Sequence, residues 1–369
     1  MQPRYLVTGG AGFIGTRLVG RLQAAGAVHV FDSLHPQVHG PNAPAPSFPP
    51  GVRFTQGDVR DPVALGEVLR QARPTVVVHL AAETGTGQSF DEITRYCETN
   101  VTGTARLIEA IRLHAPDVKR VVLASSRAVY GEGPYRSADG TVRMAAPRSP
   151  ARMAAGDFEV RCPETGEPIV GVPANASYGV APVSVYGATK LMQEYLLVLN
   201  SVGARWAPVV LRLQNVFGPG QSLLNPYTGV LSIFCSQLLA GQRIAVFEDG
   251  RITRDFVFVD DVVDALSRAS DLALSPPPDP LDIGSGQQCT ILDAARDLVR
   301  HLGLDESRIA ISGQFRQGDI RFAAADIARA RRELGWVPRV PLTEGLRRLA
   351  AWSSESHRRL QAAAGTRTE

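Results

Sequence analysis

The chain has few cysteines, and their spacing argues against disulfides and a structural metal. Four cysteines occur in 369 residues, at positions 97, 162, 235 and 289, without a Cys-x-x-Cys pair or a His/Cys cluster. The segment CPETG at Cys162 is half of a metal knuckle without a second half. We therefore expect free thiols, no disulfide framework and no bound metal.

Runs of basic residues and long apolar runs are also missing. The formal net charge is +3, and the Lys and Arg residues are scattered, unlike the clustered cations that follow a nucleic acid backbone. No apolar run approaches the roughly 20 residues of a membrane-spanning helix, and no signal peptide is recognised. We expect a cytoplasmic protein without nucleic acid or membrane partners, whose weakly basic balance suits a small anionic substrate.

Short β-branched segments alternate with helix-periodic segments over the first two hundred residues. Such alternation is typical of βαβ units and a parallel sheet, and residues 12–26 and 100–115 have the apolar stripe of helices that cover a sheet. The fold class that this pattern predicts is α/β, with a doubly wound parallel sheet. The expected strands are 4–10, 27–32, 51–58, 75–82, 120–126 and 208–218.

Some segments depart from this alternation. Residues 35–51 are too rich in proline for a helix or a central strand, so we expect a surface loop. Residues 131–182 are polar and rich in Gly and Pro, which predicts an insertion or flap. Further along, the alternation loosens. The expected organisation is therefore a nucleotide-binding domain at 1–214, a smaller α/β substrate-binding lobe at 215–355 and a flexible tail at 356–369.

The glycine-rich segment VTGGAGFIG lies between the first expected strand and the first expected helix. Its glycines satisfy Gly-x-Gly-x-x-Gly, the spacing of dinucleotide-binding turns. Gly9 would permit the tight turn, Gly12 would let the backbone approach a pyrophosphate, and Gly15 would allow close helix packing. The first helical turn, with Phe13 and Ile14, would offer N–H groups to the phosphates. This context predicts a Rossmann-type domain.

Asp32 ends the second expected strand, at the usual distance of about twenty residues from the glycines. A carboxylate there can accept both hydroxyls of an adenosine ribose and would repel a 2′-phosphate, which selects NAD as the cofactor. Asp58 follows the third strand and could reach the adenine, although an Asp in a Gly-Asp turn caps the backbone about as often.

Several motifs occur in the order of a known family. Together with Asp32, the segments TGGAGFIG, HLAA, SSRAVYG, YGATK, RLQNVFGPG and RDFVFVDDVVDA resemble the extended short-chain dehydrogenase/reductase family, and within it the nucleotide-sugar epimerases and dehydratases. The resemblance covers residues 6–349. The further NAD contacts that it implies are Asp58, Val59, Leu80, Ala81, Ala82 and Asn100.

The resemblance also implies a catalytic triad of Ser126, Tyr186 and Lys190. A free Tyr has a pKa of about 10, and a nearby Lys ammonium and the positive nicotinamide ring would favour its phenolate. Tyr186 would then take the proton of a sugar hydroxyl, Lys190 would also hold the nicotinamide ribose, and Ser126 would hydrogen-bond the reacting oxygen. From its position alone, Ser126 could instead be a hydroxyl that caps a strand end.

Substrate contacts are implied at the same edge of the sheet. Asn215, Arg254 and Arg316 match the family's elements for the substrate diphosphate, and planar guanidinium groups suit bidentate phosphate contacts. Each of these arginines could instead be a surface charge. The other implied substrate contacts are Glu83, Ser125, Ser126 and Arg127.

Two positions after Ser126 distinguish reactions within the family. The family's 4,6-dehydratases have an Asp-Glu pair there, whereas this chain has Arg127 and Ala128, which cannot act as acid and base. The resemblance therefore implies an NAD-dependent nucleotide-sugar 4-epimerase that transiently oxidises C4 to a 4-keto sugar and returns hydride to the opposite face. The segments SSRAVYGEG and RLQNVFGPGQSLLNPYTG are most similar to the dTDP-L-rhamnose 4-epimerase branch, which indicates a dTDP-6-deoxyhexose.

Other functions stay open at this point. A 4,6-dehydratase or 4-ketoreductase could use the same fold, and a non-catalytic NAD-binding protein could keep the fold, although it would be expected to lose the triad. Helical segments 89–113 and 187–203 resemble the pair through which the family forms a homodimer. The same apolar faces could also be core.

Overall fold

The centre of the molecule is a seven-stranded parallel sheet in the order β14-β9-β5-β4-β1-β2-β3. The computed structural model describes residues 2–41, 44, 46–223, 225, 229–277, 279–316 and 318–365. The strand order reverses between β1 and β4, which confirms the predicted doubly wound, Rossmann-type sheet. Its strands are β1 (Arg4–Thr8), β2 (Ala27–Asp32), β3 (Arg53–Gln56), β4 (Val76–His79), β5 (Arg120–Ser126), β9 (Ala207–Leu213) and β14 (Leu281–Ile283).

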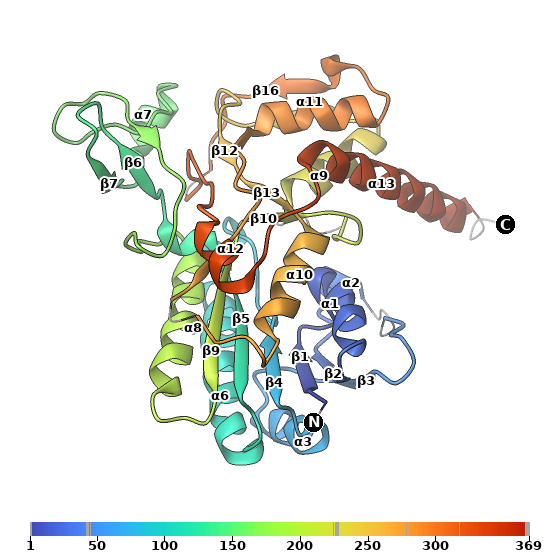
Figure 1. Ribbon diagram of the computed structural model, residues 1–369. Coiled ribbons are helices and arrows are strands. Elements are labelled where there is room, and N and C mark those ends of the chain that lie inside the picture. The colour runs from blue at the N-terminus through green and yellow to red at the C-terminus, as the bar shows by residue number, and fades with distance from the viewer. Residues whose placement is uncertain are drawn as a thin grey trace.

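Helices cover both faces of this sheet (Figure 1). Successive side chains of a strand face opposite sides, and β1 shows the result: Val7 belongs to the core beneath one helical layer, and Leu6 to the core beneath the other. One layer contains α1 (Phe13–Gln23) and α10 (Val259–Ala269). The other contains α3 (Pro62–Ala72), α6 (Gly103–His114) and α8 (Val185–Ser201).

A smaller lobe lies above the carboxyl ends of the strands in Figure 1. Its helices are α9 (Val230–Leu239), α11 (Ile291–His301) and α13 (Leu342–Gly365). α12 (Ala328–Leu334) packs instead against α10 and β14. The strand pairs of the lobe are β10 (Asn215–Phe217) with β13 (Phe256–Phe258), β11 (Ile244–Val246) with β16 (Ile309–Ile311), and β12 (Thr253–Arg254) with β15 (Cys289–Thr290). Among the described residues, no helix is both long and apolar enough to cross a membrane.

The chain crosses back into the large sheet after residue 214. α10 packs against α1, and β14 pairs in parallel with β9, so that Leu281 lies beside Leu211. The division into 1–214 and 215–355 stays a prediction. α10 and β14 belong to the later range by sequence but pack within the first domain.

Three details differ from the sequence expectations. The strand expected at 208–218 is broken at Gln214, because β10 leaves the large sheet and pairs with β13. The expected loop at 35–51 contains the short helix α2 (Pro36–His39), which is compatible with a proline at the first helical position. The expected flexible tail begins within α13, which continues to Gly365, and residues 366–369 lie outside the described residues.

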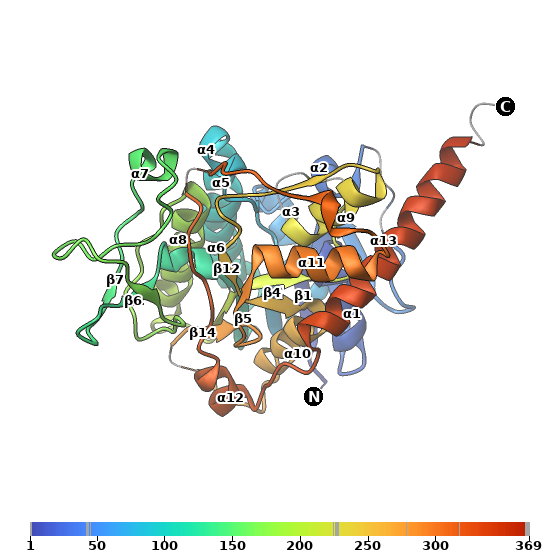
Figure 2. The same cartoon turned by 90° about the horizontal axis from the view of Figure 1, so that it is seen from above.

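The insertion at 131–182 forms a small three-stranded sheet at the side of the molecule (Figure 2). Its elements are β6 (Pro134–Arg136), β7 (Val142–Met144), α7 (Pro150–Ala154) and β8 (Val170–Gly171). The N–H of Ala181 donates to the carbonyl of Val129 at 3.0 Å. The two ends of the insertion therefore lie next to each other in the large domain.

Candidate active site

The glycine-rich turn between β1 and α1 is shaped for close backbone approach. Gly9 has a φ of +70°, and a Cβ on it would lie 2.6 Å from the backbone nitrogen of Ala81. A Cβ on Gly15 would lie 2.5 Å from the carbonyl oxygen of Gly9. Gly12 precedes α1 without a side-chain cap, so the start of the helix can offer its N–H groups to a pyrophosphate.

Asp32 at the end of β2 has the setting expected of a ribose ligand. Its Oδ2 accepts the N–H of Ala11 at 2.9 Å, and its Oδ1 accepts the N–H of Leu34 at 2.8 Å. These bonds fix the carboxylate, and each oxygen keeps a further lone pair for a hydroxyl. The turn and the carboxylate together fit the adenosine and pyrophosphate of NAD.

Two other predicted NAD contacts have partners within the protein. Asp58 pairs with Arg60 at 2.7 Å. Asn100, which is fully buried in the π-helical segment η1 (Cys97–Thr102), donates to the carbonyl of Glu83 at 3.1 Å and to Oγ1 of Thr189 at 3.0 Å. Asn100 therefore holds the segment after β4 against α8.

Helix α8 brings the predicted triad together at the end of β5. The helix begins at Val185 because the hydroxyl of Ser184 caps the N–H of Gly187 at 3.0 Å. A Cβ on Gly187 would lie 2.6 Å from the carbonyl oxygen of Ala128, so this glycine allows α8 to approach the segment after Ser126. Ser126 Oγ accepts the N–H of Ala128 at 3.1 Å. Tyr186 at the start of α8 lies near enough to Ser126 to interact with it, and Lys190 follows one turn later.

Burial dominates the electrostatics of the triad. It raises the pKa of Tyr186 above its ordinary value, whereas the hydrogen bond with Ser126 and the charge of Arg127 oppose that shift. Burial also lowers the pKa of Lys190 to about 7, against the effect of Glu194. The protein alone thus does not favour the expected phenolate, because both groups lose hydration. The charge of the Lys190 ammonium and the positive nicotinamide ring of bound NAD would have to offset this burial.

Arg127 lies within electrostatic reach of Tyr186. Burial, followed by the charge of Arg254, lowers the pKa of Arg127 to about 10, and the phenol of Tyr186 acts in the opposite direction. An arginine in this setting stays charged at neutral pH, so it can bind an oxygen of a substrate but cannot transfer a proton.

The residues predicted to bind a diphosphate differ in setting. Arg254 is buried, donates to the carbonyl of Ile320 at 2.9 Å and pairs with Asp319. Arg316 is exposed, and its guanidinium lies 4.5 Å from the ring centre of Phe247. The buried Oδ1 of Asn215 has no hydrogen-bond partner among the described residues. Asn215 thus has an acceptor available for a ligand, and the joint role of the arginines stays a prediction.

Two further predicted substrate residues have partners inside the protein. Ser125 Oγ donates to Glu194 at 2.5 Å, because Ser125 and its neighbour Ser126 face opposite sides of β5. Glu83 pairs with Arg95 at 2.7 Å. A motif that contains two adjacent serines does not distinguish them, but the alternation along the strand does.

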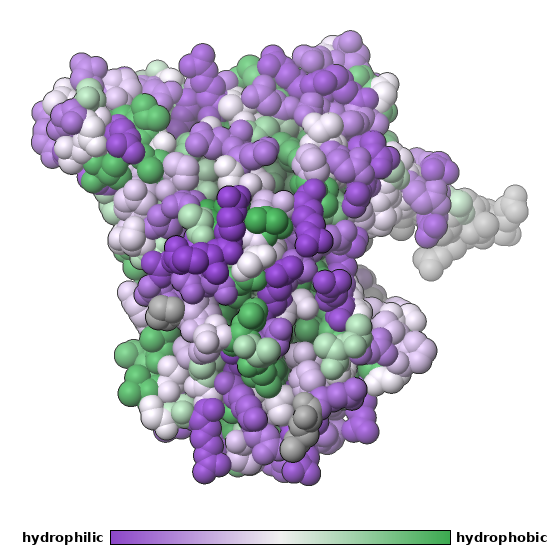
Figure 3. Space-filling view, viewed as in Figure 1, coloured by the Kyte–Doolittle hydropathy of each residue, from purple (hydrophilic) through white to green (hydrophobic). Residues whose placement is uncertain are grey.

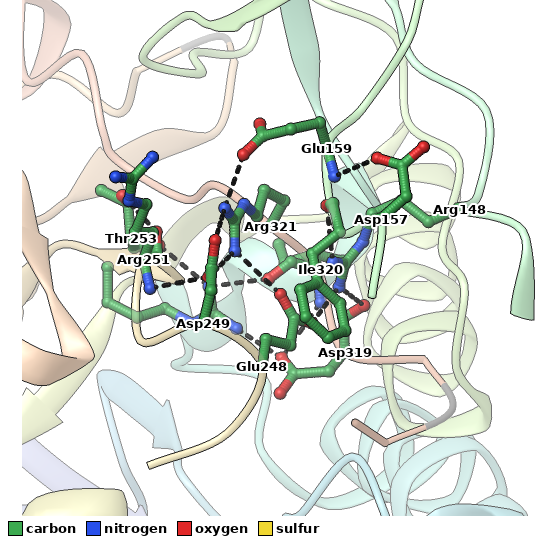
Figure 4. Close-up of polar contacts among 12 residues, drawn as sticks. Arg148, Asp157, Glu159, Glu248, Asp249, Arg251, Thr253, Asp319, Ile320 and Arg321 are labelled. Atoms are coloured by element: carbon green, nitrogen blue, oxygen red, sulfur yellow. Dashed lines mark hydrogen bonds and ion pairs between the residues drawn. The ribbon is translucent and has the colours of Figure 1, made fainter. Parts of the chain in front are cut away.

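A network of ion pairs, which sequence analysis missed, fixes the insertion to the smaller lobe (Figure 4). Arg321 pairs with Glu248 at 3.0 Å, with Asp249 at 2.6 Å and with Glu159 of the insertion at 2.7 Å. Arg148 of the insertion pairs with Glu248 at 2.8 Å. The partners of Arg321 are 72 to 162 residues away along the chain, so no local spacing could have revealed them.

Known proteins are similar to this chain in sequence and in fold. The NAD dependent epimerase/dehydratase family matches residues 5–152 and 163–284. The chain is 42% identical over 356 residues to dTDP-L-rhamnose 4-epimerase of Burkholderia thailandensis, with 95% of each chain covered. Among solved structures, the UDP-glucose 4-epimerase of Thermotoga maritima with UDP-glucose matches with a TM-score of 0.76 at 27% identity, covering 95% of this chain and 99% of that one.

A second solved structure contains the cofactor. The UDP-glucose 4-epimerase of Thermus thermophilus in complex with NAD matches with a TM-score of 0.75 at 27% identity, covering 95% of this chain and 98% of that one. These matches agree with the predicted family and with NAD as its cofactor. The chain therefore belongs to the NAD dependent epimerase/dehydratase family, a part of the extended short-chain dehydrogenases/reductases.

Proposed function

We propose that the protein is an NAD-dependent nucleotide-sugar 4-epimerase. The observation that supports this most directly is the combination of Ser126, Tyr186 and Lys190 at one site with Arg127 and Ala128 directly after the serine. The first three suffice for reversible proton and hydride exchange at a carbinol carbon. The other two cannot perform the proton transfers of water elimination, which disfavours a 4,6-dehydratase.

The residues of this chain perform the proton chemistry. Bound NAD supplies the acceptor and the donor of a hydride at sugar C4. Tyr186 takes the proton of the C4 hydroxyl as the carbon is oxidised and returns it when the carbon is reduced. Ser126 hydrogen-bonds the reacting oxygen and orients it toward Tyr186. Lys190 holds the nicotinamide ribose and stabilises the negative charge of the phenolate.

We infer that the substrate is a dTDP-6-deoxyhexose such as dTDP-L-rhamnose. The identity of 42% to a dTDP-L-rhamnose 4-epimerase supports this sugar, and the guanidinium groups of Arg254 and Arg316 support a diphosphate. The open oxygen of Asn215 can accept a hydroxyl or an N–H group of the substrate. A 4-ketoreductase is disfavoured because Asp32 suits NAD rather than the phosphorylated cofactor that reductases commonly use.

Deuterium at C4 of the substrate tests this function. dTDP-L-rhamnose labelled there is expected to give a C4-inverted product that keeps the label in ordinary water without added NADH. NMR would detect loss of the label, which would contradict the return of the same hydride to C4. A stable 4-keto-6-deoxy product would instead favour a 4,6-dehydratase. UDP-glucose labelled at C4 serves as the comparison. If only UDP-glucose is epimerised, the proposed 4-epimerase activity stands and the proposed dTDP-6-deoxyhexose substrate is rejected.

We also propose that the protein forms a homodimer through α6 and α8. Apolar side chains stand exposed along α8 at helical spacing, with Met192 44%, Tyr195 48% and Leu199 70% exposed, and Leu113 of α6 is 76% exposed. Figure 3 shows hydrophobic residues at the left edge of this face, over α8. Covering such a stripe with a second copy would remove it from water.

A charge in this stripe tests the dimer. Val198 belongs to the same exposed face of α8, with 44% of its surface exposed. Light scattering is expected to give twice the chain mass of 39.6 kDa for the wild type and the monomer mass for Val198→Arg, because a buried unpaired arginine is costly. The matched control is Val170→Arg on β8, where an equally apolar residue is exposed away from α8. A monomeric wild type, or a dimeric Val198→Arg, would contradict the proposal.

A further inference from the structure

Lysine is rare in this chain, which makes the catalytic ammonium accessible to direct observation. The sequence holds two lysines, Lys119 and Lys190, among 39 Lys and Arg residues. Lys190 has 3% of its surface exposed. Burial lowers its pKa to about 7, and Glu194 is the charged group that raises it.

Glu194 lies one turn after Lys190 on α8, and both of its oxygens are fixed. Arg212 of β9 donates from Nε to Oε1 at 3.0 Å and from Nη2 to Oε2 at 2.7 Å. Ser125 of β5 adds a hydrogen bond from Oγ to Oε1 at 2.5 Å. All three side chains are buried. These bonds satisfy both carboxylate oxygens and hold the side chain of Glu194 in one position.

Other titratable groups lie around Lys190 and Glu194, but none of them supplies a second negative charge to Lys190. Tyr130 accepts from Arg212 at 2.8 Å and donates to Asp282 of β14 at 2.9 Å. Burial raises the pKa of Asp282 to about 8, so this group is mostly protonated at neutral pH. From β4, His79 faces Lys190; burial and the lysine charge lower the pKa of His79 to about 3, which leaves the imidazole neutral.

We propose that Glu194, held by Arg212 and Ser125, is a positioning residue whose negative charge favours the ammonium form of Lys190 one helical turn away. The chemical purpose of this role rests on the proposed function, because the ammonium is needed to favour the Tyr186 phenolate. Glu194 acts through Lys190 and does not itself contact the reacting atoms. Without its charge, the burial of Lys190 would release the proton below neutral pH.

Carbon NMR of the two lysines tests this inference without any sugar. The protein is labelled with ¹³C at the lysine ε-carbons and saturated with NAD, and Lys119→Arg assigns the signals. The titration midpoint of Lys190 is expected to fall by about one pH unit or more in Glu194→Gln, which is the usual size of the effect of a nearby buried charge. An unchanged midpoint of Lys190, or an equal shift of Lys119, would overturn the proposal.

Two further variants separate this role from a general effect on folding. Glu194→Asp keeps the charge at a greater distance, so a smaller fall of the Lys190 midpoint is expected, and a fall as large as that of Glu194→Gln would count against the proposal. Asp261→Asn removes a buried carboxylate of α10 that accepts the N–H groups of Arg339 and Val340. It should leave the midpoint unchanged, and a shift there would overturn the specific role.

Activity gives a second, independent readout. With dTDP-L-rhamnose, kcat of Glu194→Gln is expected to decline with rising pH earlier than kcat of the wild type, by the same shift as the NMR midpoint. A declining limb that does not move would contradict the link between Glu194 and turnover. If no sugar nucleotide is turned over while the NMR shift is seen, the proposed function fails and the role of Glu194 stands.

Discussion

Tyr186→Phe is expected to lower kcat by about 10² to 10⁴, the usual contribution of a positioned acid or base. The variant keeps the ring and removes only the hydroxyl that exchanges the proton with the sugar. NAD affinity should change little, because the turn at Gly9 and the carboxylate of Asp32 are untouched. Single-turnover kinetics and calorimetric NAD titration measure the two effects separately.

Tyr195→Phe is the matched control for that variant. Tyr195 lies on the same helix, in the stripe proposed for the dimer. Phe keeps the apolar ring at this position, so loss of the hydroxyl should leave kcat unchanged. Near wild-type turnover of Tyr186→Phe would reject Tyr186 as the base. A parallel loss of NAD binding would show that the tyrosine acts through the cofactor site instead.

Arg321→Met is expected to lower the free energy of unfolding by about 3–5 kcal/mol, the usual cost of removing one partner from a buried ion pair. Glu248 has 1% of its surface exposed and pairs with Arg321 and Arg148, so the variant removes one of its two partners. The variant also breaks the ion pair between Arg321 and Glu159 of the insertion. Chemical denaturation of the NAD-free protein measures this change. Glu248→Gln in the same molecule should restore part of the loss, because the unpaired charge is then gone.

A surface ion pair provides the control for the network. Arg347 pairs with Glu344 at 2.7 Å on α13, and 59% of its side chain is exposed. Because exposed pairs are well hydrated before and after unfolding, Arg347→Met should leave the denaturation midpoint unchanged. Equal effects of the two variants would show that the network at Arg321 does not anchor the insertion.

The parts of the fold that sequence could predict are those with local signals. The strands expected at 27–32 and 120–126 have the bounds of β2 and β5, because β-branched residues between turn residues form a pattern that needs no distant partner. The spacing of the glycines and of Asp32 likewise predicted the turn between β1 and α1 and the carboxylate at the end of β2. The motif on α8 placed Tyr186 and Lys190 one helical turn apart.

The parts that sequence could not predict depend on distant partners. The break at Gln214 follows from the N–H of Asn215, which donates to the carbonyl of Asp255 at 3.0 Å, forty residues later. The spacing of Glu194 from Lys190 is visible in the sequence, but its role depends on Arg212 of another strand. The lowered pKa of Lys190 likewise follows from burial that no local pattern shows.

The adjacent ends of the insertion make it an exchangeable module, whereas the two main regions are not separable. A fragment that stops at residue 214 would lose β14 and α10, and would expose the edge of β9 to other chains. Hybrids between relatives are therefore unsuited to a junction at that point. Grafting 131–182 needs the joint between Val129 and Ala181 and compatible charges opposite Arg321. It also needs the contacts of the insertion with residues 322–326, where Ala174 donates to the carbonyl of Ala324 at 2.8 Å and the ring of Tyr135 packs against that of Phe322.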